Sequence, residues 1–187
     1  MNNNADYGKN EKGNLVMPQE FLPNGNLNPG IHNYNIEEFE NQFIVDFPGS
    51  ESRAAIYENF KRWLQILVKV LPPAYIWLDG SYLTKKLNPN DIDLIVFYDP
   101  DNISEDQSLL LQQLINKTSR DYNCDAYLCY TFDNWDPQRV ALIPNMHTIM
   151  RTYWMGQFGF DRQQQAKGII QLNQQELISY SIGGVTA

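Results

Sequence analysis

Residues 75–98 read YIWLDGSYLTKKLNPNDIDLIVFY, and the rest of the chain is organised around them. An apolar segment, Tyr75–Leu78, leads into the small pair Gly80-Ser81. After a polar stretch, a second apolar segment, Ile92–Tyr98, follows. Two short apolar segments bounded by turn-forming residues predict two β-strands with a turn and a loop between them.

Two aspartates, Asp91 and Asp93, open the second predicted strand. Residues two apart on a strand point to the same side, so both carboxylates project together. They repel each other unless positive charge lies nearby, and oxygen-rich pairs of this kind bind Mg²⁺ or Mn²⁺. Upstream, Gly80-Ser81 offers backbone N–H groups that suit a phosphate. Together they indicate nucleotide chemistry; the alternative is that the aspartates only solvate a strand end and Gly-Ser is only a tight turn.

The Gly80-Ser81 turn, followed by Asp91-Ile92-Asp93 between apolar residues, resembles the signature of the DNA polymerase beta-like nucleotidyltransferase superfamily. The resemblance covers residues 75–130 and is greatest to the small members found in bacterial and phage-related toxin–antitoxin or abortive-infection systems. One feature differs: many minimal members place Arg and a further Gly directly after the turn, whereas here Tyr82–Lys86 follow.

The resemblance implies a role for each carboxylate. Asp91 and Asp93 would coordinate two Mg²⁺ (or Mn²⁺) ions, one of them bound to the triphosphate. A third carboxylate comes from a later strand in this superfamily. Asp125, in the strand predicted for residues 123–132, is the residue that matches, and it would hold the catalytic ion and help to deprotonate the acceptor hydroxyl.

A triphosphate also requires cationic side chains, and the candidates are Lys85, Lys86, Arg151, Arg162 and Lys167, of which Lys85, Arg162 and Lys167 are the predicted site residues. Arg162 and Lys167 follow a glycine-containing segment, residues 156–161, that we expect to be a flexible turn able to close over a nucleotide. Each candidate, taken alone, is more readily read as an ordinary surface charge. Several aromatic residues are candidates for stacking on the base, with no choice among them: Tyr82, Tyr127, Tyr153 and Phe160.

The periodicity predicts an α/β (α+β) fold with a mixed sheet of about four or five strands and helices mainly on one face. The resemblance implies that this fold is nucleotidyltransferase-like. Helical spacing of apolar residues follows a cap at Asn35, a cap at Ser50 or Ser52, and a cap at Ser104. Residues 1–34, rich in Asn, Gly and Pro, predict a partly mobile N-terminal arm. Residues 35–187 are expected to form a single domain.

Composition limits the function further. The formal net charge of −8 argues against broad nonspecific binding to nucleic acid. No apolar stretch is long enough to cross a membrane, and the N-terminus lacks an apolar signal core. Cys124 and Cys129 are expected to face opposite sides of a strand and not to pair, which fits a reducing, cytoplasmic location.

Three functions fit these observations. The first is a metal-dependent nucleotidyltransferase that moves a nucleoside monophosphate from a nucleoside triphosphate to a hydroxyl of a protein, a tRNA or a small molecule. The second is an interaction module of the same fold that binds nucleotide or a partner protein without catalysis. The third, a synthase of a nucleotide second messenger, is disfavoured because the chain has no obvious second domain to enclose two nucleotides.

Overall fold

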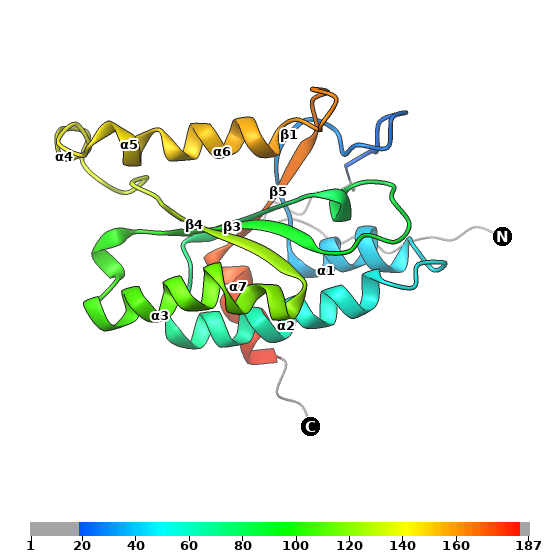
Figure 1. Cartoon of the computed structure of the whole chain (residues 1–187), viewed down its shortest axis with the longest axis horizontal. Helices are drawn as coiled ribbons and strands as arrows, with labels where there is room; N and C mark the ends of the chain where they lie inside the picture. The colour runs from blue at the N-terminus through cyan, green and yellow to red at the C-terminus, as the bar shows by residue number, and fades with distance from the viewer. Residues whose placement is uncertain (1–18, 184–187) are drawn as a thin grey trace, which may run out of the picture.

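The computed structural model describes residues 19–183, which form one mixed five-stranded sheet in the order β1-β5-β2-β3-β4 (Figure 1). The outer pairs, β1 with β5 and β3 with β4, are parallel, whereas β2 is antiparallel to both of its neighbours. The strand bounds are Gly30–Asn33 (β1), Tyr75–Asp79 (β2), Ile92–Tyr98 (β3), Cys124–Tyr130 (β4) and Gly168–Asn173 (β5). The predicted α/β class with a mixed sheet is confirmed.

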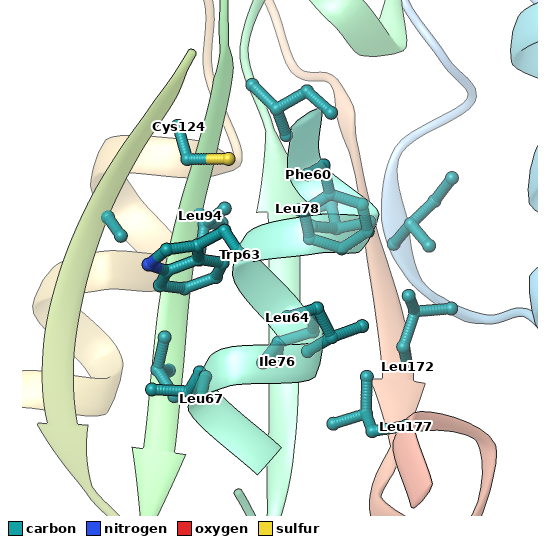
Figure 2. Packing of buried hydrophobic residues seen from close by; sticks show 14 of the residues in the cluster. Phe60, Trp63, Leu64, Leu67, Ile76, Leu78, Leu94, Cys124, Leu172 and Leu177 are labelled. Atoms are coloured by element: carbon teal, nitrogen blue, oxygen red, sulfur yellow. The ribbon is translucent and has the colours of Figure 1, made fainter. Parts of the chain in front are cut away.

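Most of the helices cover one face of the sheet (Figure 1). They are α1 (Ile36–Glu40), α2 (Arg53–Val70), α3 (Glu105–Asn116) and α7 (Gln174–Gly183), and α1 continues into a π-helical turn at Asn41–Val45. Figure 2 shows the long helix α2 lying along the sheet, with Trp63 and Leu67 over β3 and Leu64 beside Ile76 of β2. Each such side chain, once buried, contributes about 1.5–3 kcal/mol of stability relative to exposure.

The opposite face is covered by a run of shorter helices, α4 (Pro137–Val140), α5 (Asn145–Thr148) and α6 (Met150–Phe158). Under α6 the sheet presents a smaller apolar cluster in which the Tyr75 ring stacks on Phe97 with centroids 4.4 Å apart. Cys129 belongs to this cluster and Cys124 to the cluster on the α2 face, and both thiols are free. The prediction that the cysteines face opposite sides is confirmed.

The helix starts follow from local capping. Asn35 and Ser104 each accept a hydrogen bond from the backbone three residues later and form complete capping boxes with Glu38 and Gln107. At the start of α2, the Ser50 hydroxyl accepts the Arg53 N–H. No helix among the described residues is long and apolar enough to cross a membrane.

Two predictions need correction. Residues 19–34 of the predicted mobile arm belong to the domain, because β1 pairs with β5 and Leu27 is fully buried; residues 1–18 of that arm lie outside the described part of the chain. The predicted flexible turn at residues 156–161 is also wrong in its first half. Helix α6 continues to Phe158, since Gly156 is tolerated inside a helix whose other residues are mostly apolar.

Candidate active site

Three aspartates stand in a row across neighbouring strands. Asp79, the last residue of β2, pairs in register with Asp93 of β3, and Asp93 pairs with Asp125 of β4. Backbones of adjacent strands lie about 4.8 Å apart, so the three side chains are neighbours. The residues two positions along each strand belong to the apolar cluster under α6. The aspartates therefore project on the α6 face, and Asp91, two residues before Asp93, adds a fourth carboxylate on that side.

The Gly-Ser turn lies directly against this row. Gly80 has a φ of +85°, which L-residues with a side chain rarely adopt, and a Cβ placed on it would stand 1.9 Å from Oδ2 of Asp93. The chain then makes a single 3₁₀ turn, Ser81–Leu83. A glycine is required here because the Asp93 carboxylate occupies the space that any side chain would fill.

A buried arginine fixes the loop after the turn. Arg53 at the start of α2 is fully buried, and its guanidinium donates to the carbonyls of Tyr82 (2.8 Å), Thr84 (2.7 Å) and Lys86 (2.7 Å), and to that of Phe43 (3.1 Å). Burial lowers the pKa of Arg53 to about 10, so it remains charged at neutral pH. Four carbonyl acceptors partly replace the water that the cation loses on burial. Helix α2 thus positions the Gly-Ser loop.

A buried ion pair connects the row of aspartates to β5. Lys167, next to the first residue of β5, places its Nζ 2.7 Å from Oδ2 of Asp79. Asp79 is only 3% exposed, and its other oxygen, Oδ1, is buried without a hydrogen-bond partner. Burial raises the pKa of Asp79 to about 7, while the Lys167 ammonium acts to lower it. A carboxylate this poorly satisfied is unusual in a structural position.

These groups line one cleft of about 840 Å³ between the Gly-Ser loop, the first residues of β3 and β4, and the segment from α6 to β5. All the predicted site residues except Lys85 line it: Gly80, Ser81, Asp91, Asp93, Asp125, Arg162 and Lys167. The Lys85 backbone N–H instead donates to the Gly25 carbonyl (2.9 Å), and its ammonium lies 5.9 Å from the centre of the Phe21 ring. The neighbouring Lys86 lines the cleft in its place.

Electrostatics identify Asp93 as the centre of the carboxylate group. Burial, followed by the negative charges of Asp91 and Asp125, raises the pKa of Asp93 to about 6. The positive charges of Lys167 and Arg162 lower the pKa of Asp93, but they only partly offset these effects.

Asp125 is engaged by its own neighbours. The Tyr127 hydroxyl donates to Oδ2 of Asp125 (2.8 Å), and Nε of Arg120 lies 3.7 Å from Oδ1. The bond to Asp125 raises the pKa of Tyr127 to about 12. Among residues 19–183, no three carboxylate, imidazole or thiol side chains are arranged as a group that could hold a metal ion. The donors are of the right chemical type for a hard divalent cation, but Asp125 would have to exchange its present partners.

The segment that carries Arg162 is ordered by internal hydrogen bonds. The Asp161 carboxylate accepts the backbone N–H groups of Gln163 and Gln165, both at 2.9 Å. Its second oxygen accepts a hydrogen bond from the Asn26 side chain (2.8 Å). This segment is therefore a bonded loop anchored to residues 19–34, and not the flexible closing turn that the sequence suggested.

Sequence reasoning missed Asp79 and Trp154. Asp79 precedes the Gly-Ser turn at the end of an apolar strand, and a lone acidic residue in that place was the available signal. Trp154 lies in a helix whose apolar residues show little periodicity, so the side facing the cleft could not be identified.

Comparison with known proteins shows which family the chain belongs to and does not indicate an activity. No curated protein and no solved structure matches the chain. Residues 19–173, which include the sheet and the whole cleft, match a family of unknown function, DUF6932, and the chain therefore belongs to that family.

Proposed function

We propose that this protein is a metal-dependent nucleotidyltransferase, which transfers a nucleoside monophosphate from a nucleoside triphosphate to an acceptor hydroxyl and releases pyrophosphate. The observation that carries the proposal is that Asp91, Asp93 and Asp125 line the same cleft as Arg162 and Lys167. Carboxylates that can bind metal, together with cations that can bind phosphate, are what phosphoryl transfer requires. The resemblance of residues 75–130 to the DNA polymerase beta-like superfamily supports the same reaction.

The carboxylates suit Mg²⁺ or Mn²⁺ in their donor chemistry. Burial, and after it the negative charges of Asp91 and Asp125, raises the pKa of Asp93, and a bound divalent cation would favour the charged carboxylate. Asp91 and Asp93 would hold two ions, with Asp125 as a further ligand. When bound, such ions would stabilise the attacking and leaving oxygens of an in-line displacement at the α-phosphorus.

The side chains of the protein have separate roles in this scheme. Ser81 and the backbone of its turn bind the terminal phosphates, whose charge Lys167 and Arg162 offset. Asp125 accepts the proton of the acceptor hydroxyl as that oxygen attacks the α-phosphorus. The bond to the bridging oxygen breaks, and its electron pair leaves with pyrophosphate. The acceptor is a protein, a tRNA or a small molecule, and we place the reaction in the cytoplasm, where the two buried thiols remain reduced.

A second candidate is an interaction module that binds nucleotide, and a partner protein as in toxin–antitoxin systems, without catalysis. The observation in its favour is that Asp125 is already hydrogen-bonded by Tyr127 and lies beside Arg120. Under this alternative the cleft binds a nucleotide but never positions Asp125 for chemistry.

One experiment separates the two. The protein is incubated with a cell extract and each of the four labelled nucleoside triphosphates in Mg²⁺ or Mn²⁺, and protein, RNA and small molecules are then separated. Transfer by wild type, reduced at least about a hundredfold in Asp93→Asn, supports the enzyme, since loss of a metal ligand removes about 2.7 kcal/mol or more of transition-state stabilisation. The exposed Asp46→Asn serves as the matched control. Nucleotide binding without any transfer product supports the interaction module instead.

A further inference from the structure

The cleft is lined by two chemically different sets of residues. Carboxylates and the Gly-Ser turn form one set, as described above. The other set is aromatic, and its rings come from β4, from α6 and from the loop after α6. The aromatic residues that line the cleft are Tyr127, Trp154, Phe158 and Phe160. An apolar wall beside a polar phosphate site matches the two-part chemistry of a nucleotide.

The structure distinguishes among the aromatic residues that the sequence offered for stacking. Tyr82 is fully buried, and its hydroxyl donates to the Arg53 carbonyl (2.9 Å), so it serves the core. Tyr153 is half exposed but does not line the cleft. Tyr127 and Phe160 do line it, and Trp154 joins them.

Phe160 is the most available of these rings. Its side chain is 51% exposed and lies two residues beyond α6, whereas Phe158, the last residue of α6, is buried. The Trp154 ring, which also lines the cleft, packs on Tyr127 with centroids 4.7 Å apart. The Trp154 N–H is shielded from solvent and has no acceptor, so what this residue can offer to the cleft is its ring. The aromatic set thus combines one exposed ring with a packed pair of rings.

The surrounding polar groups are amides. Asn24, Gln157 and Gln163 line the same cleft, and a carboxamide offers both donors and an acceptor, as the edge of a base requires. Phe160 is bridged to Ala166 across the loop that also carries Arg162, and Lys167 follows directly. One short segment therefore presents an aromatic ring and two cations to the same cleft.

We infer that the aromatic residues of the cleft form a nucleobase site, in which Phe160 stacks on the base and Trp154 and Tyr127 supply further ring surface. This inference rests on the proposed function, because it assigns the base of the same triphosphate whose phosphates face the Gly-Ser turn. Stacking on an aromatic ring is tolerant of base identity, so discrimination among bases falls to the amide side chains of Gln157 and Gln163.

The test is calorimetric titration of the whole chain with ATP, GTP, CTP and UTP in Mg²⁺, with inorganic tripolyphosphate as the base-free probe. We expect Phe160→Ala to weaken nucleoside triphosphate binding about tenfold, which corresponds to about 1.4 kcal/mol and lies within the range for base–aromatic stacking. Tripolyphosphate binding should stay within about twofold of wild type, because the phosphate contacts are untouched. Phe160→Tyr should restore nucleotide affinity.

The matched control is Met155→Ala, since Met155 is a 40% exposed apolar residue of α6 that does not line the cleft. Melting temperatures of all variants check that an exposed ring has been removed without loss of the fold. As an independent readout, quenching of tryptophan fluorescence by nucleotide should be lost in Trp154→Phe, because Trp63 and Trp77 are fully buried and the fourth tryptophan, Trp135, does not line the cleft.

Two results would overturn the inference and leave the proposed function standing: tripolyphosphate binding to wild type as tightly as the nucleoside triphosphates, or nucleotide affinity unchanged in Phe160→Ala. A third result is distinct from both. If wild type binds neither nucleoside triphosphates nor tripolyphosphate, then the proposed function fails and the base site fails with it.

Discussion

Gly80 and Asp93 are packed so closely that one methyl group on Gly80 would stand 1.9 Å from Oδ2 of Asp93. Gly80→Ala must therefore displace the carboxylate at the centre of the site, and it also strains a backbone with φ of +85°. We expect the free energy of unfolding to fall by about 1–3 kcal/mol and nucleotide transfer to be lost.

The control for this change is Gly156→Ala in α6, where an added Cβ meets nothing within 4 Å. Alanine is the better helix former, so this variant should be as stable as wild type or more stable by up to about 1 kcal/mol. Urea unfolding measures both variants. Equal stabilities for Gly80→Ala and wild type, with full activity, would refute the close packing of Gly80 against Asp93.

The carboxylates make stability depend on pH in metal-free buffer. The folded protein keeps protons on Asp93 up to about pH 6 and on Asp79 up to about pH 7, whereas the unfolded chain releases them near the ordinary value of 3.8. Between these limits the folded state binds more protons, so the free energy of unfolding contributed by these groups falls as pH rises.

Asp93→Asn removes the part of this fall in the free energy of unfolding that comes from Asp93. Relative to wild type, the variant should gain about 1–2 kcal/mol at pH 8 and almost nothing at pH 4. Urea unfolding at the two pH values with a chelator measures the difference, and adding Mg²⁺ should stabilise wild type more than the variant. An Asp93→Asn protein that is less stable than wild type at pH 8 without metal would assign Asp93 a structural role.

The buried pair of Lys167 and Asp79 predicts a strong coupling. Lys167→Met leaves the Asp79 carboxylate buried and unpaired, so the free energy of unfolding at pH 8 should fall by about 2–4 kcal/mol. The loss should shrink at pH 5, where Asp79 can take up a proton instead. The double variant Asp79→Asn, Lys167→Met should recover most of the stability, and a double-mutant cycle gives the coupling energy. Additive losses would contradict the pairing.

Arg53 should control the mobility of the loop that follows the Gly-Ser turn. Arg53→Lys keeps the charge but loses the planar guanidinium whose two NH2 groups donate to four backbone carbonyls. We therefore expect the free energy of unfolding to fall by about 2–4 kcal/mol. Hydrogen exchange should quicken at the amides of Leu83 and Thr84, which both bond back to the Gly-Ser turn. Arg62→Lys, exposed on the same helix, is the control. Unchanged hydrogen exchange in Arg53→Lys would show that the loop after the Gly-Ser turn is ordered without the Arg53 guanidinium.

The parts of the fold that local pattern governs could be predicted from the sequence. Short apolar segments bounded by turn-forming residues identified β2 and β3, and the helix caps at Asn35 and Ser104 followed from residues within one turn. Strand β1 was missed because Gly30–Asn33 has no strand pattern of its own. It is extended because β5, far away in the chain, supplies its hydrogen-bond partners.

The candidate site was predictable to the same extent. Asp91 and Asp93 share a face by alternation, and the register of β3 with β4 then placed Asp125 beside Asp93. Asp79 was not recognised, because its importance comes from Lys167, which reaches it from the start of β5. Lys85 and Lys86 are equivalent in sequence, and only the course of the loop decides that Lys86 lines the cleft.

The position of β5 between β1 and β2 has a consequence for biosynthesis. A ribosome that has translated only as far as β4 has already made every aspartate of the row, but not Lys167, which completes the cleft. The position between β1 and β2 stays empty until Asn173 has left the exit tunnel. A nascent chain that reaches only β4 therefore carries every aspartate of the row, but it lacks Lys167, the ion-pair partner that the buried Asp79 carboxylate has in the folded protein.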